Sequence, residues 1–213
     1  MMKPKFFVFE GIDGCGKTTQ LELLAQKLGE HGIPHIATRE PNGGNPAGKL
    51  ARAATHGEID LTDEALALIF AADRSQHIRD VISPALKNGE HVLCDRYYFS
   101  NLAYQTIGGG LGFGDVAAYN RKAIEDHKPD LTFFIDEDVE ECLYRIWKRS
   151  GKKARGIYEN AASLESARKN YLRAFEKLCG EGEVLIIESR GKTIGEISRI
   201  VYDKAIDLIN PAV

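Results

Sequence analysis

The stretch Phe-Val-Phe-Glu-Gly-Ile-Asp-Gly-Cys-Gly-Lys-Thr-Thr, residues 7–19, decides how the rest of the chain is interpreted. Its spacing is a glycine, four residues and then Gly-Lys-Thr, placed between an apolar run and a segment with helical periodicity. Glycines let the backbone curl so that successive N–H groups point at phosphate oxygens, and the start of a helix adds a positive dipole end. The stretch predicts a loop that binds the phosphates of ATP, formed by Gly11, Ile12, Asp13, Gly14, Cys15, Gly16, Lys17, Thr18 and Thr19.

Three side chains of this loop have separate interpretations. Lys17 offers a compact cation to the β- and γ-phosphates, and the Thr18 hydroxyl is a hard ligand for Mg²⁺. Cys15 stands at the start of a helix, where a thiolate is favoured. Because a thiolate there would compete with phosphate, we interpret Cys15 as a small residue that fills the loop.

Length and composition describe one ordinary domain that spans residues 1–213, with 43% hydrophobic and 28% charged residues. A net charge of −3 provides no basic field to attract nucleic acid. No run is long enough for a membrane span, and Glu10 interrupts the first apolar run too early for a signal peptide. The four cysteines show no paired spacing, which favours a reducing cytoplasm and excludes a disulfide framework.

Strand and helix patterns alternate along the chain. Apolar runs predict strands at residues 5–10, 34–38, 91–94, 131–135 and 184–187. Helical periodicity covers residues 17 to about 29, 62–88, 114–127, 138–149, 162–179 and 193–209, whereas residues 39–44 are a loop by their proline and glycines. This order predicts an α/β protein with a parallel sheet covered on both faces and ligands at the carboxyl ends of the strands.

Acidic residues follow two of these strands. Asp95 can hold Mg²⁺ directly or through water, and the adjacent Arg96 can grip a phosphate with two hydrogen bonds. Asp136 ends the next strand along the chain and is a rival metal carboxylate. We rank Asp136 lower because the residues after it resemble the acidic start of a helix.

Phe70 and Arg74 are four residues apart and therefore share one face of a helix. An aromatic plane beside a forked donor is suited to a flat ring that carries carbonyl groups. Without further context, a core phenylalanine next to a surface arginine is the better interpretation of this pair.

Residues 148–155 contain five cations and no acid, with glycines at and just after this stretch. A mobile basic loop can close over a triphosphate and place guanidinium charge on the transferring group, although a solvated basic turn is the simpler interpretation without the phosphate loop. The glycines of residues 108–114 follow a helix-like stretch and not a strand, so they are no dinucleotide fingerprint.

Taken together, these segments resemble the thymidylate kinase family of nucleoside-monophosphate kinases over nearly the whole chain. Residues 93–105, Leu-Cys-Asp-Arg-Tyr-Tyr-Phe-Ser-Asn-Leu-Ala-Tyr-Gln, resemble the family signature along its full length. Residues 38–41 resemble its second loop, with Asn42 where a glycine is common, and the Phe70–Arg74 pair resembles its nucleobase platform. The resemblance implies the three-layer P-loop kinase fold, with a five-stranded parallel sheet, a short mobile lid at about residues 149–160, and a homodimer.

The resemblance also implies roles for single residues. Asp13 would contact the deoxyribose 3′-hydroxyl and organise the metal and Arg96, while Arg39 and Arg96 would orient the acceptor phosphate. The residues that would line the base and sugar are Phe70, Arg74, Ser100, Asn101, Tyr104 and Gln105. Metal ligation falls to Thr18 and Asp95, and catalysis to Asp13, Lys17, Arg96, Arg149 and Arg155.

Two positions depart from the family pattern. Some members carry an arginine inside the phosphate loop, where this chain has Gly14, and members without it take catalytic arginines from the lid. The basic lid fits that second arrangement, but Ile157 stands where the other type has arginine in Arg-Tyr-Glu-Asn. Both Arg149 and Arg155 remain candidates for the catalytic lid residue.

The expected reaction is phosphoryl transfer from ATP to deoxythymidine monophosphate (dTMP), which gives the diphosphate for dTTP synthesis, with Mg²⁺ as cofactor. A deoxynucleoside kinase would need a carboxylate base and a strand-end Glu-Arg-Ser, whereas residues 95–97 are Asp-Arg-Tyr. A nucleotide-dependent switch protein would carry the guanine-reading Asn-Lys-x-Asp, which the sequence lacks. We therefore expect ATP and dTMP as partners, and neither nucleic acid nor membrane.

Overall fold

The computed structural model describes residues 3–124, 126–150, 156–178 and 183–210. Its strands are β1 (Phe6–Glu10), β2 (His35–Arg39), β3 (His91–Asp95), β4 (Leu131–Asp136) and β5 (Glu183–Glu188). Its α-helices are α1 (Lys17–Glu30), α2 (Pro46–Thr55), α3 (Asp63–His77), α4 (Ser83–Lys87), α5 (Tyr98–Tyr104), α6 (Phe113–Ile124), α7 (Val139–Ser150), α8 (Ala161–Lys177) and α9 (Ile194–Ile209). A π-helical turn covers Ile78–Ile82 and a 3₁₀ turn covers Ile107–Gly109.

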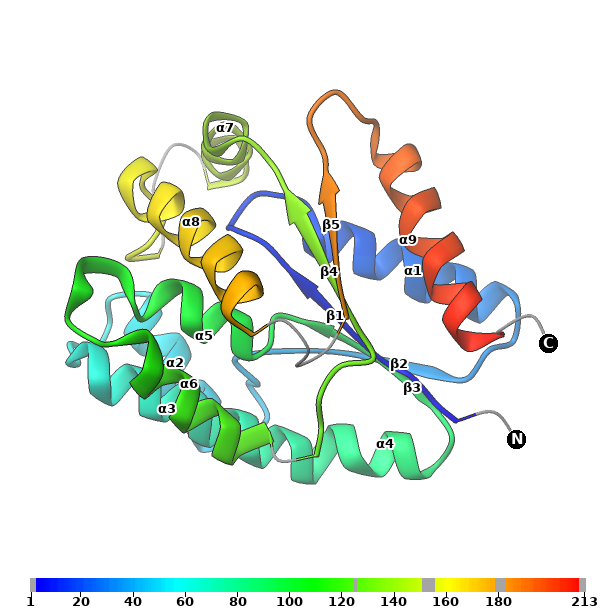
Figure 1. Ribbon diagram of the computed structural model, residues 1–213, viewed down its shortest axis with the longest axis horizontal. Helices are drawn as coiled ribbons and strands as arrows, with labels where there is room; N and C mark the ends of the chain where they lie inside the picture. The colour runs from blue at the N-terminus through cyan, green and yellow to red at the C-terminus, as the bar shows by residue number, and fades with distance from the viewer. Residues whose placement is uncertain (1–2, 125, 151–155, 179–182, 211–213) are drawn as a thin grey trace.

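The five strands form one sheet in the order β2-β3-β1-β4-β5, and every pairing is parallel. Helices α1 and α9 contact each other over one face, whereas α5 and α8 contact each other over the opposite face (Figure 1). The predicted α/β fold with five parallel strands and helices on both faces is therefore confirmed. Parallel strands need helical crossovers, which explains why both faces are covered.

The burial of each strand follows its place in the sheet. All residues of β1 and β3 are buried, as the continuous apolar run of β1 predicts, while β2 and β5 at the edges stay partly exposed. Phenylalanines of β1 and β4 pack against each other at the centre, with ring centroids of Phe9 and Phe133 5.1 Å apart. Because β1 and β3 are paired in parallel, their carboxyl ends lie side by side. The polar residues that follow the two strands therefore lie close together.

The structure differs from the predicted segments at three places, and one of them is helix α5, which the sequence analysis did not predict. Residues 46–55 form helix α2, which the sequence analysis did not predict; Asn45 caps it by accepting a hydrogen bond from the Gly48 amide, and Pro46 occupies its first turn. The predicted helix over 62–88 is interrupted by the π turn, where the Ser83 amide donates to the Ile78 carbonyl. Pro84 follows directly and lacks an N–H, which explains the irregular hydrogen bonding before it.

The other predicted helices match within a few residues. Helix α3 begins after Thr62, whose hydroxyl accepts from the Ala65 amide as expected of an N-cap. Across the described part of the chain, no helix combines the length and apolarity that crossing a membrane requires.

Candidate active site

The predicted phosphate loop lies between the end of β1 and the start of α1. Gly11, Gly14 and Gly16 all have positive φ, and Gly16 is the left-handed N-cap of α1. Lys17 is 6% exposed, and its ammonium lies 3.8 Å from the Asp13 carboxylate and 3.5 Å from the Ile12 carbonyl. The curled backbone, the helix start and the cation form the arrangement that an anionic phosphate chain needs.

Helix α7 packs directly on this loop. A side chain at Gly14 would collide with the carbonyl of Cys142, so the close approach of α7 depends on glycine at this position. Cys15 and Cys142 are both buried, and burial raises the pKa of each thiol, which keeps it protonated. A protonated Cys15 agrees with its interpretation as a small residue that fills the loop.

Thr18 and Asp95 meet at the first turn of α1. The Thr18 hydroxyl donates to Oδ2 of Asp95 over 2.6 Å, while Oδ1 of Asp95 is buried with no hydrogen-bond partner among the described residues. A hydroxyl, an unpartnered carboxylate oxygen and the oxygens of a nucleotide are the hard ligands that Mg²⁺ takes, so this pair fits the metal. Within the described ranges no cluster of three or more His, Cys, Asp or Glu residues could hold a metal by itself. Asp136, the rival, is ion-paired with Arg168 at 2.5 Å.

Arg96 follows β3 in a left-handed conformation, with φ of 72°, which only a strongly supported non-glycine residue adopts. Its guanidinium donates to oxygens of Asp13 (2.7 Å), Gly11 (3.0 Å), Ser100 (3.0 Å), Tyr171 (3.0 Å) and Tyr104 (3.5 Å). Burial works against its charge, but Tyr104, Asp13 and Tyr171 outweigh burial and hold the pKa of Arg96 well above its ordinary value. Arg96 is therefore a fixed cation beside the phosphate loop.

Asp13 connects Arg96 with the loop. Burial raises the pKa of Asp13, but the charges of Arg96 and Lys17 outweigh burial and lower it to about 2. The charge of Arg149 acts in the same direction. Asp13 is thus a carboxylate at neutral pH, surrounded by cations from the loop, from β3 and from the end of α7.

Glu10, at the end of β1, accepts hydrogen bonds from residues that surround Arg96. One of its oxygens accepts from the backbone amides of Tyr97 (2.9 Å) and Ser100 (3.1 Å), and the other from the hydroxyls of Ser100 (2.7 Å) and Tyr171 (2.8 Å). Burial raises its pKa, against the opposing charge of Arg96 and these hydrogen bonds. The sequence analysis missed Glu10 and Tyr171, because a lone acid in an apolar strand and a tyrosine in a distant helix carry no local signal.

A cavity of about 200 Å³ opens next to Arg96. All nine predicted substrate-binding residues line it: Asp13, Arg39, Phe70, Arg74, Arg96, Ser100, Asn101, Tyr104 and Gln105. Its remaining walls include four residues that the sequence analysis did not assign to the site, namely Glu40, Arg52, His56 and Tyr158. Asp13 of the phosphate loop and the predicted base platform therefore line one cavity.

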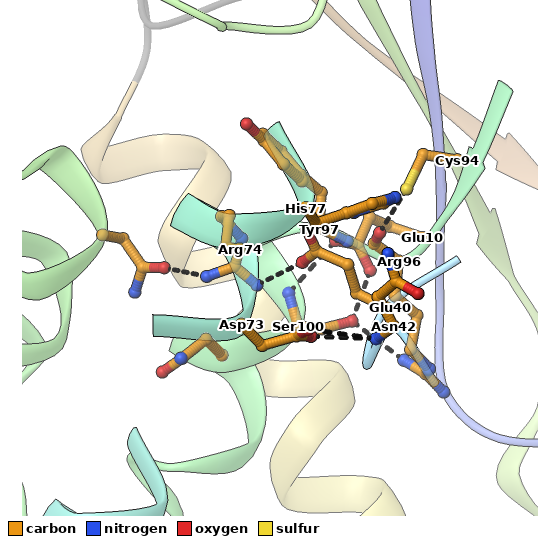
Figure 2. Close-up of polar contacts among 12 residues, drawn as sticks. Glu10, Glu40, Asn42, Asp73, Arg74, His77, Cys94, Arg96, Tyr97 and Ser100 are labelled. Atoms are coloured by element: carbon orange, nitrogen blue, oxygen red, sulfur yellow. Dashed lines mark hydrogen bonds and ion pairs between the residues drawn. The ribbon is translucent and has the colours of Figure 1, made fainter. Parts of the chain in front are cut away.

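At the other end of the cavity, Arg74 is 1% exposed and not the surface arginine that its pattern alone favoured. It forms an ion pair of 2.7 Å with Glu40, donates to Asn120 and lies over the ring of Tyr97 (Figure 2). Its Nε has no partner among the described residues. A buried guanidinium with an unused donor on a cavity wall is equipped to bind a carbonyl oxygen.

The remaining predicted residues of the cavity wall differ in how many contacts fix their side chains. Asn101 donates to the Ala67 carbonyl, while its own oxygen is buried and has no hydrogen-bond partner in the part of the chain that the structure describes. Gln105 donates to the Tyr158 hydroxyl over 3.1 Å. Ser100 is engaged by Glu10 and Tyr171, as described above. Arg39 has a side chain 57% exposed and lies 3.9 Å from Asp95, so it can move toward a bound anion.

Of the two lid candidates, Arg149 lies exposed near the end of α7, and Arg155 lies outside the described residues. The sequence analysis also missed Arg145, one turn before Arg149, whose Nη1 donates to the Gly14 carbonyl over 3.4 Å. Ion pairs of 2.9 Å with Glu137 and 2.8 Å with Glu141 hold Arg145 over the loop. The four-residue spacing from Glu141 is the one local signal that pointed to it.

Comparison with known proteins agrees with this geometry. The sequence model described as Thymidylate kinase matches residues 9–199. The chain is 43% identical to a thymidylate kinase of Pelotomaculum thermopropionicum, over 80% of both chains, and 41% identical to one of Fervidobacterium nodosum, over 91% of this chain and 94% of the other. It is 38% identical to a thymidylate kinase of Geotalea daltonii, over 96% of this chain and 98% of the other. The chain belongs to the thymidylate kinase family.

Proposed function

We propose that this protein transfers the γ-phosphoryl group of ATP to dTMP and forms the diphosphate, a step toward dTTP. The observation that carries the proposal is the cavity described above, which brings Asp13 of the phosphate loop and Arg96 to the same space as Phe70 and the buried Arg74. The thymidylate kinase relatives, which match nearly the full length of the chain, support the same activity. The reaction belongs to the transferases that act on nucleoside monophosphates.

The acceptor determines what the protein has to do. A phosphate monoester with a second pKa near about 6 is already an anion at neutral pH, so it attacks phosphorus without a general base. Catalysis then rests on positioning the two phosphates and neutralising the charge that spreads over the transferring group. The buried Lys17 and the partly exposed Arg96 are the cations for this task, and Asp13 forms an ion pair with each of them.

Thr18 and Asp95 would hold Mg²⁺ together with phosphate oxygens, and the ion when bound neutralises phosphate charge. Residues 11–19 of the loop bind the ATP phosphates through backbone amides and Lys17. Arg39, which is exposed and adjacent to Asp95, helps Arg96 orient the acceptor phosphate.

A lid arginine would supply the remaining positive charge for the transferring phosphoryl group. We assign the segment at about residues 149–160 to a lid on the single domain, with Arg149 or Arg155 on the transferring phosphoryl group. Arg149 is supported by its electrostatic effect on Asp13. Gly14 fits this role of the lid, because any side chain there would push α7 and its arginines away from the loop.

Base and sugar are selected at the other end of the cavity. Phe70 stacks on the ring, Arg74 donates to the carbonyl at position 4, and Asn101 and Gln105 contact the remaining edges. Tyr104 crowds the 2′ position of the sugar and disfavours ribose. The expected order is dTMP first, deoxyuridine monophosphate next, and cytidine or purine monophosphates far behind.

A panel of nucleoside monophosphates, assayed with ATP and Mg²⁺ for diphosphate formation, tests the proposal. We expect the highest kcat/KM with dTMP and hardly any ATP turnover without an acceptor. Equal efficiency with deoxycytidine monophosphate (dCMP) would contradict the base assignment, and ATP turnover that needs no acceptor would contradict the kinase assignment.

We also propose that the protein is a homodimer of the reducing cytoplasm. Leu50 on α2 and Leu68 on α3 are 37% and 45% exposed on two helices that contact each other, which provides apolar surface for a second copy. The described cysteines Cys15, Cys94 and Cys142 are free thiols, which suits a reducing compartment. Light scattering during gel filtration tests the dimer, and a monomeric mass would contradict it.

A further inference from the structure

A chain of polar contacts runs from Thr38 on β2 to the base end of the cavity, and Figure 2 labels its members His77, Glu40 and Arg74. His77, at the end of α3, is fully buried; its Nε2 lies 2.7 Å from the Thr38 hydroxyl and its Nδ1 lies 3.1 Å from Oε1 of Glu40. The other oxygen of Glu40 is ion-paired with Arg74 at 2.7 Å. The chain thus links Thr38, His77, Glu40 and Arg74, and only its last two members line the cavity.

The chemistry of Glu40 fixes the direction of its hydrogen bond with His77. A carboxylate only accepts, so Nδ1 of His77 carries the proton toward Glu40. The Thr38 hydroxyl can donate or accept, and it completes the contact with Nε2. His77 therefore supplies the donor that occupies Oε1 of Glu40, while Oε2 remains for Arg74.

The position of Arg74 depends on that arrangement. One terminal nitrogen faces Glu40 and the other donates to Asn120, whose own amide nitrogen donates to the Val116 carbonyl over 2.7 Å. With both terminal nitrogens held, the direction of the unpartnered Nε–H is set by Glu40 and Asn120. If Oε1 of Glu40 lost its donor, the carboxylate could turn and take the guanidinium with it.

We propose that His77 is a positioning residue for nucleobase selection, which acts through Glu40 on Arg74. It touches no substrate, since Glu40 and Arg74 lie between it and the cavity. The inference rests on the proposed function, because it assigns His77 a role in orienting Arg74 of the base-binding wall. A purely structural role predicts lost stability with unchanged selectivity, whereas a positioning role predicts lost selectivity.

Two isosteric substitutions separate these roles. An asparagine amide places its nitrogen near the position of Nδ1, so His77→Asn retains the donor to Glu40 and loses the contact with Thr38. A glutamine amide reaches the position of Nε2, so His77→Gln retains the contact with Thr38 and loses the donor to Glu40. Each variant removes one hydrogen bond of His77, and its melting temperature reports how far the loss of that bond alone destabilises the fold.

The measurements are kcat and KM for dTMP and dCMP in the full-length protein, with the melting temperature of each variant. We expect His77→Gln to raise KM for dTMP about tenfold and to lower the dTMP-to-dCMP ratio of kcat/KM by a similar factor. His77→Asn should stay within about threefold of wild type in both quantities, and KM for ATP should change in neither variant. Thr38→Val, which removes the other end of the chain, serves as the control and should behave like His77→Asn.

Equal dTMP-to-dCMP ratios in wild type, His77→Asn and His77→Gln would overturn the inference and leave the proposed function intact. A wild-type protein that does not prefer dTMP would overturn both. If His77→Gln does not fold, Glu40→Gln replaces it, because it removes the charge that faces both His77 and Arg74. The same loss of selectivity is then expected, and an unchanged ratio would count against the inference.

Discussion

Two arginines approach one cavity, and the molecule holds them in different ways. Arg96 follows β3 with a left-handed backbone, and its carboxylate partner Asp13 has a side chain 35% exposed. Arg74 lies within helix α3, and its partner Glu40 is 2% exposed. The first pair is open to solvent and to a ligand, whereas the second is enclosed.

The difference corresponds to what each end of the cavity has to bind. At the phosphate end, charge moves during the reaction, so cations with partly accessible partners can exchange a protein carboxylate for a phosphate oxygen. At the base end, a neutral ring must be read by donors of fixed direction, which an enclosed pair provides. We therefore expect substitutions at the phosphate end to lower kcat and those at the base end to alter KM and selectivity.

The largest effect is expected from Lys17→Ala. This ammonium is the cation that we propose for the β- and γ-phosphates, so its removal should lower kcat by about 10³-fold or more. Lys5→Ala breaks an ion pair of 3.3 Å with Asp130 at the opposite end of β1 and provides the control. Steady-state kinetics with circular dichroism checks the prediction; a folded Lys17→Ala variant with near-normal kcat would remove the loop from the mechanism.

The lid arginines come next. Arg149→Ala or Arg155→Ala should lower kcat by about 10²-fold for whichever residue contacts the transferring phosphoryl group, with a smaller change in KM for dTMP. Lys148→Ala removes a neighbouring exposed cation and should change kcat little. If both single variants and the double variant retain the wild-type kcat, the lid supplies no catalytic arginine.

At the base end, Phe70→Ala should raise KM for dTMP with a nearly constant kcat. The loss of stacking is expected to cost about 1–3 kcal/mol, on the scale measured for base–aromatic contacts. Ser75→Ala, at an exposed position on the same helix, is the control. A fall in kcat at constant KM would contradict the assignment of kcat effects to the phosphate end of the cavity and of KM effects to the base end.

The smallest effect concerns the acid stability that Asp13 provides. Because its native pKa is about 2, below the ordinary value of 3.8, the unfolded chain binds a proton between about pH 4 and pH 2 that the native protein does not. Its stabilising contribution is complete above about pH 4 and is lost as the pH falls toward 2. Since the carboxylate is partly exposed, we expect about 1 kcal/mol.

Denaturant unfolding at several pH values measures this contribution. Asp13→Asn should lower the free energy of unfolding at pH 6 and flatten its decline between pH 4 and pH 2. Asp138→Asn, which alters an exposed ion pair with Arg190, should leave the slope unchanged. Parallel curves for wild type and Asp13→Asn would contradict the assignment of a coupled, partly open ion pair at the phosphate end.

The sequence by itself determined the elements that short-range patterns specify. The spacing of residues 11–18 fixed the phosphate loop, and the apolar run before it fixed a buried parallel strand. The family signature at residues 93–105 placed one part of the cavity wall, namely Arg96, Ser100, Asn101, Tyr104 and Gln105, because residues on one strand end and one helix stay together in any such fold. Helix α2 was not predicted from the sequence, because the Asn, Pro and Gly at its start are equally typical of loops.

Only the tertiary structure decided how the site residues are supported. Tyr171 reaches Glu10 across 161 positions of sequence, and His77 reaches Glu40 from a different element. The close approach of α7 to Gly14 and the enclosure of Arg74 likewise depend on which helix packs where. Periodicity and spacing report which residues share a strand or a helix face, whereas contacts between distant segments form only when the packed core brings those faces together.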